Sequence, residues 1–419
     1  MCDKKVFVVA AKRSAIGSML GSLANTHPAD LGGAVVRALL ESAKVAPEAV
    51  DEVIVGNILP AGNGQGIGRQ VAIKGGIPIE TPAYAVNMVC GSGMKAVINA
   101  VAEIKAGMAN LIVAGGVECM SSAPYLIPKN ARQGIKMGDF KVTDHMVFDA
   151  LTDAYSKVHM GITAENIAEK YGISRQAQDE FAYASQTKAI KAVDSGAFKD
   201  EIVPVTVKVG KEEKVFDTDE YPNRNTNPEK LAKLRPAFKP DGTVTAGNAS
   251  GINDSASFTL IASEEAVKKF ALTPMAEIIA VGQGGVDPQF MGLGPVPAIL
   301  QALKNSGLKL SQMEVLELNE AFAAQSLGVI HELSQKCDLK KEEILARCNP
   351  NGGAIALGHP VGASGNRIIV TRNDKGGQQA RSRKPVHRRR NGHRGHTQKR
   401  LIEKTNKVEN KKFIQRCIL

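Results

Sequence analysis

Short runs of apolar and β-branched residues alternate along this chain with longer segments whose apolar positions recur at helical spacing. The runs predict strands, and the longer segments predict helices. This alternation predicts an α/β fold in which helices cover both faces of a mainly parallel sheet. In the first part of the chain the expected strands are Val6–Ala10, Glu52–Ile58, Ala83–Val89 and Leu111–Ala114, and the expected helices are Asp30–Ala43, Gly68–Lys74 and Gly93–Lys105.

The pattern loosens between Ala123 and about Thr245, where polar and Pro-containing loops surround one helical stretch near Ser174–Ala192. We interpret this part as an insertion that carries binding loops. Strand-and-helix order resumes from about Ala246 to Val370. The strands expected there lie near Ala276–Val281 and Val315–Leu318.

A faint internal echo joins the two ends of this pattern. Ser92-Gly93 and Ser364-Gly365 each precede a helical run. A duplicated half-domain would produce such an echo, although Ser-Gly pairs are also common capping sequence before helices.

Composition and charge separate the body of the chain from its end. A chain of 419 residues with 43% hydrophobic content can bury a sizeable core and is compatible with two or three domains. The apolar run Val6–Ala11 is too short for a membrane span or a signal peptide, so we expect a cytoplasmic protein. The formal net charge is +11, but residues 372–419 hold 16 Lys and Arg against 3 Asp and Glu. The body is therefore nearly neutral.

The six cysteines are scattered, with no C-x-x-C spacing and no neighbouring histidine pair that would build a metal site. Reduced thiols are expected, and one of them could be reactive. Cys90 is the best candidate, because it ends an apolar strand and opens a helix with Gly91 and Gly93 beside it. A helix N-terminus is expected to lower the pKa of such a thiol. The alternative is a small buried core residue.

Two further segments carry chemistry. Five glycines surround His359 in the stretch Asn351–Gly365, which indicates a backbone that passes close to a ligand and an imidazole on a turn fixed by Pro360. No G-K-[ST] follows, so a histidine acting as base toward a cysteine fits better than a phosphate loop. Asn319 and Glu320 follow a predicted strand directly, where α/β sheets place ligand-handling groups; a capping Asn is the alternative.

Together these segments resemble the thiolase family. The matching motifs are N-x-x-C-x-S-G at Asn87–Gly93, G-G-x-E-x-M-S at Gly115–Ser121, N-E-A-F-A at Asn319–Ala323 and G-G-A-I-A-L-G-H-P-x-G-A-S-G at Gly352–Gly365, in the family's order. The resemblance extends over Gly242–Gly251 and over His159–Gly161, which is similar to the short-chain, biosynthetic branch.

The resemblance implies a function and a set of site residues. Cys90 would take the acyl group from acyl-CoA as a thioester, His359 would be the base, and Asn319 would hold a water. The reaction would condense two acetyl-CoA into acetoacetyl-CoA and CoA, or run in reverse, with coenzyme A thioesters as substrates and no tightly bound cofactor or metal. Residues that match coenzyme A or acyl-pocket positions are His159, Met160, Arg224, Phe238, Ser250, Met291 and Phe322, of which Arg224 aligns least cleanly.

The family also implies an architecture: two similar βαβαβαββ halves that form a layered αβαβα core, with an inserted loop domain. We expect the N-terminal half at residues 1–121 and 253–273, the loop domain that binds coenzyme A at 122–252, and the C-terminal half at 274–371. The assembly would be a homotetramer, or a dimer as in other members of the family.

Past the histidine block the chain departs from the family pattern. Thiolases continue through a helix and a strand to a C-x-G-G-G-x-G motif, whose cysteine removes the α-proton of the second acetyl-CoA. No such motif follows Thr371, and within residues 372–400 only Ala380 and Val386 are apolar. This stretch predicts no buried strand. Cys417 has no glycine-rich loop around it and is not a substitute.

The genetic code suggests an explanation. Codons for Val386–Gly392, read one base forward, permit Cys-Ile-Gly-Gly-Gly-Met-Gly, and Ser382–Pro385 similarly permits Leu-Ala-Ser-Leu. We therefore hypothesise that a frameshift near Thr371 replaced the C-terminus with an out-of-frame tail, residues 372–419. Acyl loading of Cys90 could survive this change, whereas condensation and thiolysis would be impaired and stability would be poor.

Three other readings remain open. The chain could be a thiolase-fold protein that binds coenzyme A thioesters without turnover, or a degradative thiolase for longer acyl chains. A nucleic-acid arm at Arg388–Arg390 is disfavoured, because no aromatic residues interleave with the basic ones.

Overall fold

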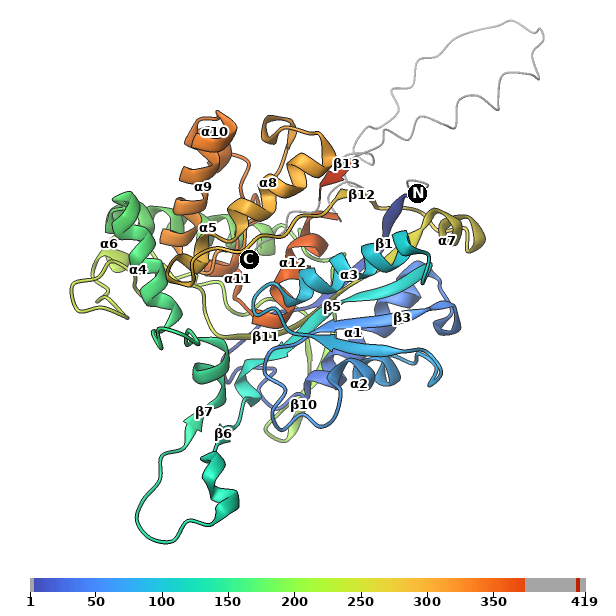
Figure 1. Cartoon of the computed structure of the whole chain (residues 1–419), viewed down its shortest axis with the longest axis horizontal. Helices are drawn as coiled ribbons and strands as arrows, with labels where there is room; N and C mark the ends of the chain where they lie inside the picture. Colours follow the sequence, from blue (N-terminus) through green and yellow to red (C-terminus); the bar gives the residue numbers. More distant parts are fainter. Residues whose placement is uncertain (1–3, 374–411, 415–419) are drawn as a thin grey trace, which may run out of the picture.

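The computed structural model describes residues 4–373 and 412–414, and its centre is a nine-stranded sheet (Figure 1). The main path runs β13-β12-β1-β11-β5-β3-β4, and the short strands β2 (Gly17–Ser18) and β8 (Ile202–Val203) pair beside it. The path strands are β1 (Val6–Ser14), β3 (Glu52–Gly56), β4 (Ala83–Val86), β5 (Leu111–Cys119), β11 (Asn253–Ser263), β12 (Ala276–Ala280) and β13 (Lys412–Ile414).

Both faces of this sheet are covered by helices, as the alternation predicts. Val53 and Val55 of β3 pack in one apolar cluster with α1 (Pro28–Ala43) and α2 (Ile67–Lys74). Ile54, between them, packs in a second cluster with α3 (Ser92–Ala106) and α12 (Val361–Asn373). Successive strand residues point to opposite faces, so a strand that is apolar throughout is buried between two helical layers.

The predicted parallel sheet is wrong at its centre. β3 pairs in parallel with β4 and β5, but β11 runs antiparallel to both β1 and β5. All eleven residues of β11 are buried. The chain enters this strand from the inserted segment, after Gly251, rather than through a crossover helix that would have kept the direction parallel.

The insertion contains the helix expected near Ser174–Ala192, together with further helices and hairpins that were not predicted. Its helices are α4 (Met160–Tyr171), α5 (Arg175–Asp194) and α6 (Pro228–Ala232). Its hairpins are β9–β10 (Val205–Val209 and Glu212–Phe216) and β6–β7 (Tyr125–Leu126 and Thr143–Asp144). The β6–β7 segment projects from the body as an arm in Figure 1.

The last part of the described chain is mainly helical. It holds α8 (Pro295–Ser306), α9 (Ala323–Cys337), α10 (Lys341–Leu345) and α11 (Ala354–Leu357) before α12. The strand expected at Val315–Leu318 is reduced to one bridge, between Leu316 and Cys348. Among the residues that the structure describes, residues 274–371 therefore contribute β12, this bridge and a further bridge between Phe322 and Ala249 to sheet structure.

The two Ser-Gly segments of the sequence echo meet where α3 and α12 begin. A Cβ on Gly93 would lie 2.8 Å from the carbonyl oxygen of Gly362, and one on Gly365 would lie 2.7 Å from the backbone nitrogen of Met94. Only glycine allows such an approach. The two helices are thereby held side by side, which Figure 1 shows at the middle of the molecule.

Two arginines are buried in the body. Arg13 donates from Nε to Glu201 at 2.8 Å and from Nη1 and Nη2 to Asp219 at 2.7 and 2.8 Å, which ties β1 to the insertion. Arg367 of α12 is equally buried, but its Nη1 and Nη2 have no hydrogen-bond partner among the described residues. Leaving such a buried charged group unpaired costs stability.

Candidate active site

Cys90 lies on the tight turn between β4 and α3. Ser92 holds this turn, because its hydroxyl accepts a hydrogen bond from the Met88 N–H at 2.8 Å and donates to the Val89 carbonyl at 2.6 Å. Val89, directly before the cysteine, has a φ of 46°. That backbone conformation is strained for a β-branched residue, and such strain often accompanies functional turns.

The thiol of Cys90 faces an apolar wall. It packs in one cluster with Ile58, Leu59, Met120 and Val361. Burial raises the pKa of Cys90 to about 11, and the nearby Glu118 carboxylate acts in the same direction. The expectation that the helix N-terminus lowers this pKa is therefore wrong, since desolvation of the thiolate outweighs it. At neutral pH the thiol is protonated and needs a base.

His359 has the protonation state that such a base needs. Ser364 donates its hydroxyl proton to the Pro360 carbonyl at 2.9 Å, so at 2.6 Å from Nδ1 it accepts the imidazole N–H. This arrangement places the remaining lone pair of the imidazole on Nε2. Burial, with a contribution from the Arg367 charge, lowers the pKa of His359 to about 4. The imidazole is therefore neutral at physiological pH.

The two polar residues after the expected strand at 315–318 have different surroundings. Asn319 places its Nδ2 3.3 Å from Nε2 of His359, and its buried Oδ1 has no partner within the described part of the chain. Glu320 accepts hydrogen bonds from Ser185 at 2.6 Å and Asn349 at 2.7 Å. Asn319 thus faces the histidine, whereas Glu320 joins α5 to the turn before the histidine loop.

Most residues expected to contact coenzyme A gather at the start of α4. The ring of His159, which caps this helix, stacks on Phe238 with centroids 4.7 Å apart, and Phe238 meets Phe322 edge-on at 6.0 Å. Met160 packs in the same cluster, and the Ser250 N–H donates to the Ala321 carbonyl at 2.9 Å beside it. Burial lowers the pKa of His159, so this aromatic surface is uncharged at neutral pH.

Met291 lies next to this cluster, on the short helix η5 (Pro288–Leu293). The helix packs against α4, where the Asn166 side chain donates to the Gln289 carbonyl at 3.0 Å.

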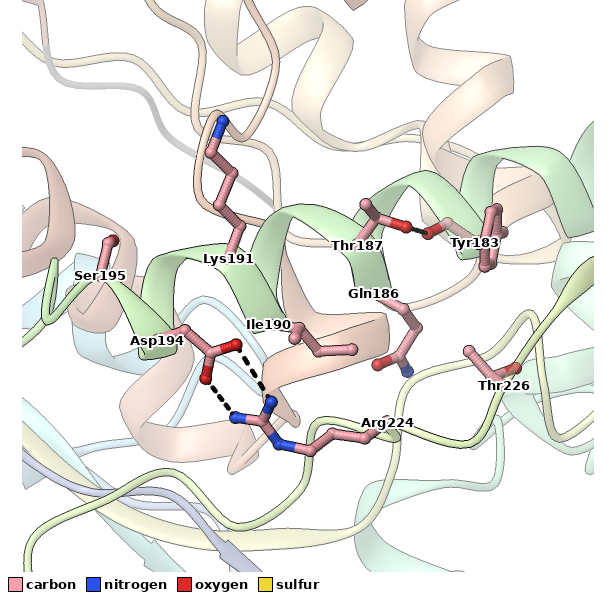
Figure 2. A pocket seen from close by; sticks show the side chains of 9 residues that line it. All are labelled: Tyr183, Gln186, Thr187, Ile190, Lys191, Asp194, Ser195, Arg224 and Thr226. Carbon is pink, nitrogen blue, oxygen red and sulfur yellow. Dashed lines mark hydrogen bonds and ion pairs between the residues drawn. The ribbon is translucent and has the colours of Figure 1, made fainter.

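Arg224 lies elsewhere, in a groove along α5 shown in Figure 2. Its guanidinium pairs with both carboxylate oxygens of Asp194, at 2.6 and 3.1 Å. The groove has a volume of about 610 Å³ and is lined by Tyr183, Gln186, Thr187, Ile190, Lys191, Asp194, Ser195, Arg224 and Thr226.

One carboxylate near Cys90, the E of the G-G-x-E-x-M-S motif, was given no role from the sequence. Glu118 stands in the otherwise apolar run Leu111–Cys119, and a buried charge in such a run is the signal that could have found it. The described residues contain no group of three or more His, Cys, Asp or Glu suited to hold a metal ion. Within the same residues no helix is both long and apolar enough to cross a membrane. Cys417 and Arg388–Arg390 lie outside the described residues.

Comparison with known proteins covers nearly all of the described chain. Residues 6–265 match the family model for the N-terminal domain of thiolase, and residues 272–381 match that for the C-terminal domain. The acetyl-CoA acetyltransferase of Pseudomonas aeruginosa is 52% identical over 367 residues, which are 87% of this chain and 91% of that protein. The acetyl-CoA acetyltransferase of Escherichia coli K12 is 51% identical over 368 residues, 88% and 91% of the two chains.

Solved structures agree. The Bacillus anthracis acetyl-CoA acetyltransferase superposes with a TM-score of 0.85 at 40% identity, covering 90% of this chain and 93% of that one. Human mitochondrial 3-ketoacyl-CoA thiolase in complex with CoA superposes with a TM-score of 0.84 at 44% identity, covering 90% and 92%.

Proposed function

This chain belongs to the thiolase family, and from that premise we propose that it is an acetyl-CoA C-acetyltransferase that works through an acetyl-Cys90 intermediate. The observation that carries this proposal is that a protonated thiol and a neutral buried imidazole both lie where the ends of α3 and α12 pack together.

The first step follows from these two protonation states. Nε2 of His359 takes the thiol proton as the Cys90 sulfur attacks the thioester carbonyl carbon of acetyl-CoA. The bond between that carbon and the sulfur of coenzyme A breaks, and the departing thiolate receives the proton back from the imidazolium. Splitting acyl transfer through a covalent thioester is ordinary nucleophilic catalysis. Asn319 would hold the water that completes the site.

The second step needs a base for the α-proton of the incoming acetyl-CoA. By family resemblance a second cysteine supplies it, and the tail of this chain has no C-x-G-G-G-x-G motif. We propose that the chain as written loads Cys90 but condenses acetyl-CoA poorly. A binding protein without turnover is the second candidate function, and the missing motif is the observation that favours it.

The coenzyme A thioester would bind across the insertion. The stacked rings of His159, Phe238 and Phe322, with Met160, Ser250 and Met291 beside them, offer an apolar channel for pantetheine. The groove along α5, with Arg224 and Lys191 as cations, would take the phosphorylated nucleotide end. The insertion would then be the loop domain.

A homotetramer in the cytoplasm fits the exposed surface. The β6–β7 arm exposes large apolar side chains, which soluble proteins usually cover at an interface. The exposed fractions are 67% for Tyr125, 63% for Ile127, 96% for Met137, 48% for Phe140 and 53% for Val142. Strand β4 also ends the described sheet path and could pair with a second copy.

A loading assay tests the proposal. Incubation of the purified chain with acetyl-CoA is expected to add one acetyl group to Cys90, seen by mass spectrometry of its peptide, and to release one equivalent of coenzyme A. Cys90→Ala should abolish both signals, whereas Cys337→Ala, a half-buried thiol outside the site, should leave them unchanged.

Because the pKa of Cys90 is raised and that of His359 is lowered, alkylation of Cys90 by iodoacetamide should accelerate with rising pH toward about 11. A chain that releases no coenzyme A, or one that labels equally without Cys90, contradicts the proposed function. Comparing acetoacetyl-CoA with longer 3-ketoacyl-CoA esters as acyl donors to Cys90 separates this activity from degradative thiolysis.

A further inference from the structure

Glu118 is a buried carboxylate that the proposed chemistry does not use. It lies near the end of β5 and is 1% exposed. Its Oε1 accepts from the Asn57 side chain at 2.9 Å and the Leu59 N–H at 3.1 Å, and its Oε2 accepts from the Ile58 N–H at 2.9 Å. The Gly362 N–H also donates to it. A buried carboxylate is tolerated only with such a set of donors.

The segments that donate to Glu118 are the ones that surround Cys90. Ile58, Leu59 and Val361 pack with Cys90 in one apolar cluster. Gly362 follows His359 by three positions, and a Cβ there would lie 2.5 Å from Oε2 of Glu118. One carboxylate therefore joins the loop after β3 to the loop that carries the base.

The ionised form of Glu118 does not help the nucleophile. An anion near Cys90 disfavours the thiolate, and Glu118 contributes to the raised pKa of that thiol. Burial also raises the pKa of Glu118 itself, while the backbone N–H groups that donate to its carboxylate act against that shift. Because Glu118 opposes ionisation of the nucleophile, the hydrogen bonds that it accepts from the surrounding loops explain its presence better than its electric field does.

We propose that Glu118 is a positioning residue for acyl transfer: by binding the loop 57–59 and Gly362 together, it sets the wall around Cys90 and the place of His359. This inference rests on the proposed function. Small displacements of reacting groups are costly, since an error of about 1 Å can reduce a rate on the order of 100-fold.

The test compares two carboxylates that accept hydrogen bonds from backbone N–H groups, the buried Glu118 near the end of β5 and the exposed Asp51 beside the start of β5. Glu118→Gln keeps the shape but turns one oxygen into a donor that faces N–H groups. Its control is Asp51→Asn, because Asp51 accepts from Asn110 and Leu111 N–H at 2.7 and 2.9 Å at the opposite end of β5. Acetyl loading of Cys90 is measured against acetyl-CoA concentration, together with the melting temperature of each variant.

Glu118→Gln is expected to lower the maximal loading rate about 10- to 100-fold, with the half-saturating acetyl-CoA concentration unchanged. Asp51→Asn should keep the parent rate even where its melting temperature falls. Equal rates for Glu118→Gln and the parent, or equal losses in both variants, overturn the inference. No loading by the parent refutes the proposed function instead, and the iodoacetamide rate at Cys90 then compares the variants.

If Glu118→Gln does not fold, Asn57→Ala removes a single donor from the same carboxylate. A loading rate reduced about two- to fivefold, on the order of one lost hydrogen bond, supports the inference. An unchanged loading rate overturns it.

Discussion

The N-terminal and C-terminal parts of this molecule each carry residues of the candidate site, but the two parts differ in how much sheet structure surrounds those residues. The N-terminal part holds Cys90 against a sheet whose strands are paired and buried on both faces. The C-terminal part holds His359 among helices, with β12 and isolated bridges at Leu316 and Phe322 as its described sheet structure.

The two buried arginines, one in each part, also differ in their hydrogen-bond partners. Arg13 binds two carboxylates, whereas both terminal nitrogens of Arg367 have no hydrogen-bond partner within residues 4–373. A buried guanidinium normally persists with its acceptors. The carboxylates of Glu317, Glu201 and Glu320 attract the charge of Arg367 without bonding its terminal nitrogens. On the frameshift hypothesis, we expect the restored C-terminus to supply acceptors for them.

Restoring the other reading frame should have the largest effect. Removal of one base near codon 371 is expected to restore the C-x-G-G-G-x-G motif, and with it a base for the second step. General-base catalysis contributes about 10²- to 10⁴-fold. The rate of acetoacetyl-CoA formation should rise by that order, while acetyl loading of Cys90 changes much less. An unchanged condensation rate would contradict the hypothesis.

Replacing each buried arginine with methionine sharpens the contrast. Arg13→Met leaves two buried carboxylates unpaired and is expected to cost about 3–5 kcal/mol of unfolding free energy. Arg367→Met removes a cation whose terminal nitrogens are unsatisfied, so its cost should stay within about 1 kcal/mol. Urea unfolding of both variants measures the two values. Similar losses would mean that Arg367 is compensated as well as Arg13.

Substitution of the glycines that separate α3 from α12 tests how tightly the N-terminal and C-terminal parts pack. We call this contact between the two helices the seam. Gly93→Ala and Gly365→Ala each force a methyl group into the partner helix and should cost about 1–3 kcal/mol. Gly285→Ala is the matched control, because nothing lies within 4 Å of its added carbon, and it should change stability by less than about 0.5 kcal/mol. Thermal unfolding of the three variants gives the comparison. If all three behave alike, the seam is not tightly packed.

Much of the fold could be predicted from apolar periodicity. Each strand and helix of the N-terminal part buries the apolar residues that recur at its own spacing. Helix Ser92–Ala106 and strand Ala276–Ala280 lie within two residues of their predicted bounds. The direction of β11 could not be predicted in the same way. Pairing direction depends on how a distant segment returns to the sheet, and the local pattern is the same for both directions.

Motifs in the sequence name candidate site residues, whose catalytic roles stay predictions, but they do not reveal the surroundings that decide the protonation state of each residue. Cys90, His359 and Asn319 lie at packed or hydrogen-bonded positions that suit their predicted roles. The direction of the Cys90 pKa was mispredicted, because a helix N-terminus is visible in sequence and desolvation is not. The donors to Glu118 come from segments about 60 and more than 240 residues away, which local sequence cannot reveal.

The seam between α3 and α12 also has a consequence for the order of events during synthesis. A ribosome makes Cys90 roughly 270 residues before His359, which at about 5–20 residues per second leaves the nucleophile without its base for some tens of seconds. During that interval the glycines of α3 have no partner helix to meet. A nascent chain would therefore not react with acetyl-CoA until its C-terminal part has packed against its N-terminal part.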